Sequence, residues 1–268
     1  MADRLRLTIL GCGSSPGTPR INGDWGACDP SNPRNRRLRA AAMIERISPG
    51  GVTRVIIDTG PDFREQMLRA GVDRIDAAVY THGHADHIHG IDDLRGYALV
   101  QRRLIDIYAD APTQARLMEG FGYCFHTPEG SSYPPILLAH GIVHDRAFRV
   151  EGEGGPLTFV PLPQIHGDIV SLGFRIGPIA YCSDVSDFPA TTPALMHGLD
   201  LLVIDALQYR RHPSHFALEQ TLEWIERLRP RRALLTHLHI PMDYATVDAE
   251  TPDHVQPAHD GLVAEFDI

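Results

Sequence analysis

Four histidines and one aspartate lie within the segment YTHGHADHIHG, at positions 80–90. The segment begins at the last residue of the apolar run IDAAVY (75–80), which has the composition of a buried strand. In an extended chain, residues two positions apart face the same way, so His82 and His84 can bind one cation. Asp86 and His87 follow at the start of a turn and point elsewhere. The spacing therefore predicts ligands for two metal centres, rather than the i, i+4 histidine pair of a helical zinc site.

Three more candidate ligands lie at the ends of apolar runs further along the chain. PQIHGD contains His166, YCSDVSD contains Asp184, and LLTHLH contains His237. The two carboxylate oxygens of Asp184 can bridge two cations that are roughly 3.5–4 Å apart. Two divalent ions, two carboxylates and a hydroxide leave a net charge of about +1, which suits a substrate with phosphoryl oxygens.

The elements that must position these residues are strands alternating with helices. Apolar β-branched runs predict strands at LRLTIL, AAMIERI, TRVIIDTG, IDAAVYTH, LIDIYAD, LTFVPLP, PIAYCSD, LLVIDAL and RRALLTH. One-sided apolar stripes predict helices over 61–71, 111–122, 192–198 and 214–230. Five of the strands end in a histidine or an aspartate: Asp58, His82, Asp184, Asp205 and His237. Because sites in α/β proteins lie beyond the carboxyl ends of strands, we predict a layered α/β protein with one polar site.

THGHADH resembles the HxHxDH motif of the metallo-β-lactamase superfamily, and the later ligands follow in the order expected for that family. The resemblance covers essentially the whole chain. It implies a single domain over 1–268 with a four-layer αββα sandwich, which is an α/β (α+β) fold. It also implies two divalent metal ions, with zinc or manganese expected. The implied ligands are His82, His84 and His166 for one ion and Asp86, His87 and His237 for the other, with Asp184 between them.

Two further segments resemble the phosphodiesterase branch of the superfamily, which includes ribonuclease Z and phosphoribosyl 1,2-cyclic phosphate phosphodiesterase. The turn TILGCGSSPG, with Ser14, leaves backbone N–H groups for an anion, although a tight turn explains its glycines equally well. His215 in RRHPSHFALEQ matches an extra histidine of this branch. With Ser214 as N-cap, His215 is expected in the first helical turn and in the role of general acid; His212 is the alternative.

The expected function is hydrolysis of a small phosphodiester, such as a cyclic ribose phosphate or a nucleotide-like compound, by attack of a metal-bridged hydroxide. Asp86 and His215 are the expected catalytic residues. The alternatives are a thioesterase or lactonase of the glyoxalase II type, and a non-hydrolytic metal-binding or nucleotide-binding protein. The cyclic phosphodiesterase relative also carries a cysteine cluster for a structural zinc. In WGACDPSNPRNRR only Cys28 is present, so that third metal is not expected here.

Several residues near the predicted ligands have two interpretations. Asp58 is predicted to orient a ligand or a loop from behind, and Asp205 either does the same or only ends its strand. Arg37 is a candidate phosphate contact, although a solvated loop explains PRNRRLR as well. His89 and His239 match no ligand position and are predicted to be structural.

The composition limits the partners of the chain. A formal net charge of −9 over 268 residues opposes binding to extended nucleic acid. No segment approaches the ~20 apolar residues of a membrane span, and the N-terminus does not resemble a signal peptide. Four scattered cysteines favour reduced thiols. These features predict a cytoplasmic protein with a small phosphate-containing substrate and no membrane partner. The oligomeric state is open, and the resemblance makes a homodimer a candidate assembly because many relatives are dimers.

Overall fold

The computed structural model describes residues 3–268, and the chain divides into two compact units. Unit 1 contains the N-terminal residues up to Leu10, the segment Ala41–Thr158 and the C-terminal segment Val263–Ile268. Unit 2 contains Gly11–Ala40 and Phe159–Leu262. The single domain expected over 1–268 stays a prediction.

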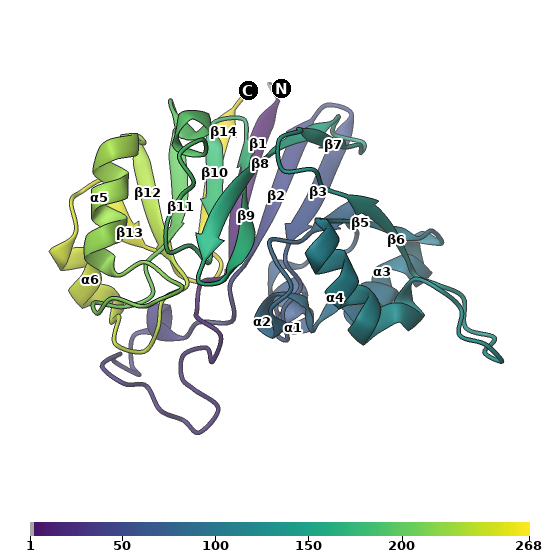
Figure 1. Cartoon of the computed structure of the whole chain (residues 1–268), viewed down its shortest axis with the longest axis horizontal. Helices are drawn as coiled ribbons and strands as arrows, with labels where there is room; N and C mark the ends of the chain where they lie inside the picture. The colour runs from purple at the N-terminus through teal and green to yellow at the C-terminus, as the bar shows by residue number, and fades with distance from the viewer. Residues whose placement is uncertain (1–2) are drawn as a thin grey trace. The chain divides into compact units, whose positions relative to one another are not determined.

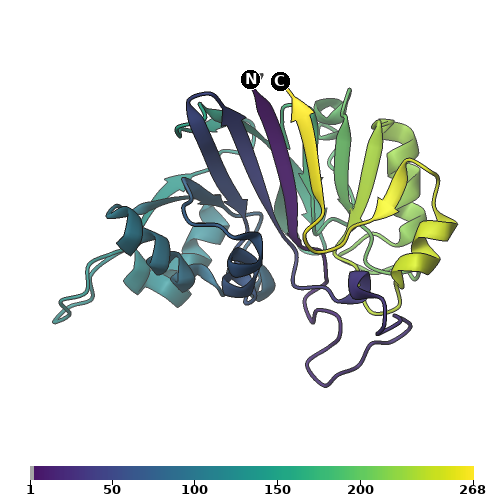
Figure 2. The ribbon, with the colours of Figure 1, turned by 180° about the vertical axis from the view of Figure 1, so that it is seen from behind.

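Unit 1 contains a seven-stranded sheet that joins the first and last strands of the chain (Figures 1 and 2). Its strands, in spatial order, are β14 (Val263–Asp267), β1 (Arg4–Gly11), β2 (Ala41–Ser48), β3 (Gly51–Ile57), β4 (Ala77–Val79), β5 (Ile105–Ala109) and β6 (Leu137–Gly141). β1 pairs with β14 and β2 with β3 in antiparallel fashion, whereas β3 to β6 are parallel. The carboxyl ends of β3 and β4 therefore meet at one edge of the sheet.

The helices of unit 1 bury one side against this sheet. They are α1 (Phe63–Ala70), α2 (Ala85–Ile88), α3 (Leu94–Gln101) and α4 (Ala111–Phe121). Two 3₁₀ turns lie at Ile91–Asp93 and Gly122–Cys124, and a short strand, β7 (Phe148–Val150), follows β6 in the chain. Met67, Leu94 and Leu117 from three of the helices pack in one core cluster with Ile56 and Ile107 of the strands. The helices predicted over 61–71 and 111–122 are confirmed as α1 and α4.

Unit 2 contains the second sheet. This sheet has seven strands, which in spatial order are β13 (Val255–Pro257), β12 (Arg232–Thr236), β11 (Leu201–Asp205), β10 (Ile179–Cys182), β9 (Ile169–Ile176), β8 (Leu157–His166) and the short β7. β10 to β13 are parallel, and β8, β9 and β10 are antiparallel neighbours. The helices are α5 (Leu218–Leu228) and α6 (Tyr244–Glu250), which lie beside β11 to β13 in Figure 1. Ile225 of α5 and Val247 of α6 are buried in the core cluster of this unit.

The segment Gly11–Ala40 of unit 2 is mostly loop, with one 3₁₀ turn at Pro33–Asn35. Gly13 N–H donates to the Leu38 carbonyl (2.8 Å), and Leu238 N–H donates to the Cys12 carbonyl (2.8 Å). Arg37 is 2% exposed, and its guanidinium donates to the Met242 carbonyl (2.6 Å). These bonds give Arg37 a structural role in holding the loop, and its contact with a phosphate stays a prediction.

Two helix predictions in unit 2 need correction. The predicted helix 192–198 is only a 3₁₀ turn, Pro193–Met196. The predicted helix 214–230 begins at Leu218, with Ala217 as its N-cap, so Ser214 is not the cap and His215 is not in the first turn. Residues 214–217 do not continue the helix, because Phe216 N–H donates to the Val185 carbonyl (2.8 Å) and the Phe216 ring is buried.

Five strands were missed in the sequence: β6, β7, β9, β13 and β14. β9 illustrates the reason, because Gly173 and Ser171 interrupt its apolar alternation. A Cβ at Gly173 would lie 2.8 Å from the Tyr181 carbonyl oxygen, so glycine is required by close packing of neighbouring strands rather than by a turn. Within residues 3–268, none of the helices combines the length and the apolar character that a membrane span requires.

Candidate metal centre

In unit 1 the candidate site begins where β3 and β4 end. Asp58 follows β3 in the left-handed region (φ 66°) and is fully buried. Its Oδ1 accepts from Thr81 N–H (2.8 Å), and its Oδ2 accepts from Thr81 Oγ1 (2.8 Å) and from His87 Nδ1 (2.7 Å). Burial raises the pKa of the Asp58 carboxyl, and the bonds from His87 and Thr81 oppose this rise. Asp58 therefore orients His87, as the sequence predicts.

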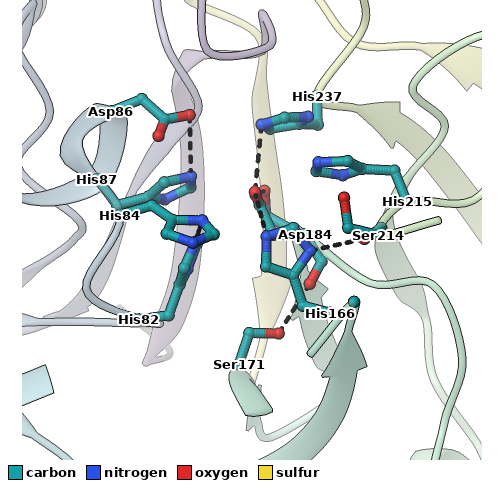
Figure 3. Close-up of polar contacts among 12 residues, drawn as sticks. His82, His84, Asp86, His87, His166, Ser171, Asp184, Ser214, His215 and His237 are labelled. Carbon is teal, nitrogen blue, oxygen red and sulfur yellow. Dashed lines mark hydrogen bonds and ion pairs between the residues drawn. The ribbon is translucent and has the colours of Figure 1, made fainter. Parts of the chain in front are cut away.

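The donor atoms of unit 1 face one another in two pairs. His82 Nε2 lies 2.9 Å from His84 Nδ1, as their two-residue spacing predicts. His87 Nε2 lies 3.5 Å from Asp86 Oδ2 (Figure 3), because Asp58 binds the other ring nitrogen of His87. Asp86 and His87 are in the short helix α2 rather than in a simple turn. Such backing of an imidazole by a carboxylate is typical of histidines that bind metals.

The loop that carries these donors is held by close backbone contact. Gly90 N–H donates to the Thr59 carbonyl (2.8 Å), and a Cβ at Gly90 would collide with the carbonyl oxygen of Gly60. Only glycine can therefore close the loop at this point. His89 is exposed at the end of α2, where its ring lies against Phe121 (5.7 Å between centroids).

In unit 2, three predicted residues follow the ends of neighbouring parallel strands. Asp184 follows β10, Asp205 ends β11, and His237 follows β12. Asp184 (φ 55°) and His237 (φ 57°) adopt the left-handed backbone conformation. This conformation costs a non-glycine residue on the order of 1–2 kcal/mol. Two strained residues, one after β10 and one after β12 on either side of β11, mark this edge of the sheet as a functional site.

The donor atoms of unit 2 converge on one oxygen of Asp184. Asp184 Oδ2 lies 3.3 Å from His237 Nε2 and 3.8 Å from His166 Nε2 (Figure 3). Asp184 Oδ1 accepts from Ser183 Oγ (2.6 Å), and His166 Nδ1 donates to the Ser214 carbonyl (2.6 Å). Ligands about 2.0–2.1 Å from a tetrahedral ion are themselves roughly 3.3 Å apart, so these spacings and donor types fit a divalent ion.

His215 lies beside these donors. Its Nδ1 donates to Asp205 Oδ2 (2.6 Å), and the same oxygen accepts from Val185 N–H (3.0 Å). The His215 ring stacks on the His237 ring, with centroids 4.6 Å apart and planes 13° apart (Figure 3). Donor atoms of His215, His166 and Asp184 lie within 4.8 Å of one another. Asp205 therefore orients a histidine and does not merely end a strand.

His212 is placed differently from His215. It is exposed, and its Nδ1 accepts from Ser214 N–H (3.3 Å). Burial of part of the ring lowers the pKa of His212, and the neighbouring His215 lowers it further. Among the residues that the structure describes, no carboxylate is bonded to His212, which favours His215 as the proton donor.

One group near the site was missed in the sequence. His239 Nδ1 lies 2.8 Å from Ser14 Oγ, and His239 Nε2 lies 2.8 Å from a guanidinium nitrogen of Arg20. Burial and the Arg20 charge lower the pKa of His239 to about 4, so the ring is neutral near pH 7. The only signal in the sequence was the spacing of His239 two residues after His237 in LLTHLH.

All four cysteines are free thiols and buried. Cys28 Sγ donates to the Ile240 carbonyl (3.3 Å) and accepts from Arg37 (3.7 Å). Burial raises the pKa of the Cys28 thiol. These contacts tie the loop to the segment after His239 and give Cys28 a structural role.

The sequence profile of the β-lactamase superfamily domain matches residues 53–238, so the chain belongs to this superfamily. A crystal structure of a new diphosphatase from the PhnP family is 37% identical and covers 100% of this chain and 99% of its own, with a TM-score of 0.89. The short form of human tRNase Z shares the fold at 18% identity, with a TM-score of 0.66 over 97% of this chain and 98% of its own. An octanoyltransferase of Porphyromonas gingivalis (strain ATCC BAA-308 / W83) is 33% identical over 98% of this chain, which spans 52% of that relative.

These similarities confirm the predicted fold class and the predicted superfamily. The chain has the metallo-β-lactamase fold, which is the fold of metal-dependent hydrolases. The fold implies divalent metal ions, and the donors of both units fit them.

Proposed function

We propose that the chain hydrolyses a phosphate ester or phosphoanhydride bond of a small, nucleotide-like phosphodiester or diphosphate. In this proposal two divalent ions, zinc or manganese, are held by the seven ligands predicted from the sequence. Those ligands are His82, His84, Asp86, His87, His166, Asp184 and His237. When bound, the ions would supply Lewis-acid activation of water and of the phosphoryl oxygens.

The observation that carries this proposal is the bond between His215 and Asp205. Because Nδ1 of His215 donates to Asp205, Nε2 is the nitrogen that can give a proton to a leaving oxygen. The bond to Asp205 also fixes the orientation of the ring, so that Nε2 keeps a defined direction. When water attacks phosphorus and the bond to the leaving oxygen breaks, His215 gives that oxygen its proton. A good thiolate leaving group would not need such a donor.

The remaining residues orient the ligands. Asp58 fixes the ring of His87, and the Ser214 carbonyl fixes the ring of His166. Asp86 contributes a carboxylate at the N-terminus of α2 and is the second expected catalytic residue. The 37% identity to a diphosphatase supports a phosphorus substrate, and the net charge of −9 supports a small one.

The test compares two substrates on protein loaded with manganese or zinc. We expect turnover of bis-p-nitrophenyl phosphate that is abolished by a chelator and restored by the added metal. Elemental analysis should give two ions per chain before chelation. Turnover that survives removal of all metal, or that occurs only with an acyl thioester, would contradict the proposal.

A second candidate is hydrolysis of an acyl thioester, the glyoxalase II-type reaction. It is favoured by the similarity to a protein named octanoyltransferase, although this chain spans only about half of that relative. An octanoyl thioester is the matching substrate for the comparison above. If this candidate holds, the thioester is turned over well and replacement of His215 has little effect.

A further inference from the structure

Ser14 lies next to the metal-binding edge of unit 2. Its N–H donates to the carbonyl of Leu238 (3.2 Å), the residue that follows the predicted ligand His237. The approach depends on Gly13, where a Cβ would lie 2.9 Å from the Leu38 carbonyl oxygen. The glycine-serine turn is thus joined to the end of β12 rather than being a free loop.

The direction of the hydrogen bonds from Arg20 to Ser14 is fixed by chemistry. A guanidinium has donors and no acceptor, so the contact between Arg20 and His239 Nε2 requires Nε2 to accept. A neutral imidazole has one N–H, which must then be on Nδ1. His239 Nδ1 therefore donates to Ser14 Oγ, and the oxygen of Ser14 is the acceptor.

The hydroxyl proton of Ser14 is therefore not used in the bond with His239 and is available for another acceptor. Within the described residues, His239 Nδ1 is the one polar side-chain atom at hydrogen-bond distance from Ser14 Oγ. Ser14 is 2% exposed, and a buried hydroxyl proton without an acceptor is unfavourable. Accepting a bond from His239 also polarises the hydroxyl and strengthens it as a donor.

We propose that Ser14 donates its hydroxyl proton to a phosphoryl oxygen of the substrate, and that His239 and Arg20 are positioning residues that hold Ser14 in this donor state. This inference rests on the proposed phosphohydrolase function. It assigns a role to His239, for which the sequence predicted only a structural one, and it gives the Gly-Ser turn a side-chain donor for the anion.

The test measures inhibition of bis-p-nitrophenyl phosphate turnover by inorganic phosphate. Ser14→Ala should raise both the inhibition constant of phosphate and KM about tenfold, the effect of losing one hydrogen bond to a charged group. kcat should change less than about twofold, and the metal content should not change. His239→Phe should match Ser14→Ala and should add nothing in the Ser14→Ala background, because both remove the same donor.

Arg20→Met provides a milder variant, since its side chain is 39% exposed. Without the Arg20 donor, His239 Nε2 is no longer kept as an acceptor, so the N–H need not stay on Nδ1 and phosphate binding should weaken. Arg20→Lys keeps a cationic donor and should retain most of the wild-type phosphate affinity. Ser15→Ala is the matched control, because Ser15 is exposed on the same turn and should behave as the wild type.

Equal phosphate inhibition constants in Ser14→Ala and Ser15→Ala overturn the inference. It is also overturned if the weaker phosphate inhibition of Ser14→Ala is accompanied by an equivalent loss of bound metal. If the wild type turns over the diester but Ser14→Ala is unchanged, the inference alone fails. If the metal-loaded wild type neither turns over the diester nor binds phosphate, the proposed function itself fails.

Discussion

His215 and His212 are close in the chain, but only His215 is bonded to a carboxylate. Its 2.6 Å bond to Asp205 fixes the ring by one nitrogen and leaves the other for proton transfer. A carboxylate–histidine pair, rather than a place in the first helical turn as expected from the sequence, thus holds the ring of His215. α5 begins at Leu218, so His215 lies before the helix and not within its first turn.

We expect His215→Ala to retain both metals and to slow hydrolysis selectively. A substrate with a poor alkoxide leaving group should lose about 10²–10³-fold in kcat, because general acid catalysis contributes about this much. A p-nitrophenyl ester should lose less than about tenfold, since its leaving group needs little protonation. Steady-state rates with the two substrate types provide the comparison.

His212→Ala is the matched control and should show no such selectivity. Equal slowing of both substrate types in His215→Ala would rule out proton donation by His215. Larger selectivity in His212→Ala would instead assign the acid to His212, the alternative left open by the sequence.

At the scale of elements, the segment 11–40 depends on the N-terminal cap of α6. Asp243 caps α6 by accepting from Thr246 N–H (3.0 Å), and it also accepts from Asn35 Nδ2 (2.6 Å) and from Asp29 N–H (3.1 Å). Burial raises the pKa of Asp243, but the hydrogen bonds from Thr246, Asp29 and Asn35 outweigh it and lower the pKa to about 2. The loop and the helix are therefore stabilised by the ionised form of one side chain.

The sign of the pH effect follows from this lowered pKa. In the unfolded chain an aspartate titrates near ~3.9, so the stabilisation by Asp243 is complete above that pH and is lost as the pH falls toward 2. Asp243→Asn can keep an oxygen for Thr246 N–H but places an amide N–H₂ where Oδ2 accepts from Asn35 and Asp29, so it should lower the free energy of unfolding at pH 7 by about 1 kcal/mol. The deficit should shrink between pH 4 and pH 2. Urea unfolding of both proteins at pH 7, 4 and 2.5 measures this difference.

Asp248→Asn is the control, because Asp248 is exposed on the same helix. It should match the wild type at each pH. A deficit of Asp243→Asn that stays constant from pH 7 to pH 2.5 would show that the ionised carboxylate is not what stabilises the cap.

At the scale of the molecule, one face of unit 1 is a candidate interface for the homodimer considered in the sequence analysis. α1 and α3 line a groove of about 530 Å³, with Leu68, Leu99 and Val100 exposed by 62%, 67% and 76%. Gly96 lies in the first turn of α3, and a Cβ there would have no neighbour within 4 Å apart from the backbone of the helix itself. An apolar face with a helical glycine allows another backbone to approach closely.

The charges around this groove favour a second copy of the chain as the partner. Arg64 and Asp93 line it with opposite charges, and neither forms an ion pair within residues 3–268. In a two-fold symmetric dimer each patch meets itself, so Arg64 of one protomer can pair with Asp93 of the other. We expect a dimer by size-exclusion chromatography with light scattering, and a monomer for Leu99→Glu.

Val143→Glu is the control, because Val143 is exposed away from this groove and should leave the dimer intact. Arg64→Glu should weaken the dimer, and Asp93→Arg in the same chain should restore it. A wild-type monomer at micromolar concentration would exclude the self-association and leave the face for a different protein.

The sequence alone determined the class of fold and the candidate ligands. Strand alternation, turn glycines and the HxHxDH spacing are local patterns, so the predicted strands from LRLTIL to RRALLTH and the His82–His84 pair appear in the structure. The same local rules failed at residues 214–217, where a long-range bond from Phe216 to Val185 outweighs helix propensity.

Only the tertiary structure decided how each side chain is held. The bonds from His87 to Asp58, from His215 to Asp205 and from His239 to Ser14 join residues 29, 10 and 225 positions apart in the chain. No local pattern fixes such pairs, because they depend on which strands become neighbours in a sheet. Since these bonds select the tautomer of each imidazole, the chemistry of the site was decided by packing, although its residue types were visible in the sequence.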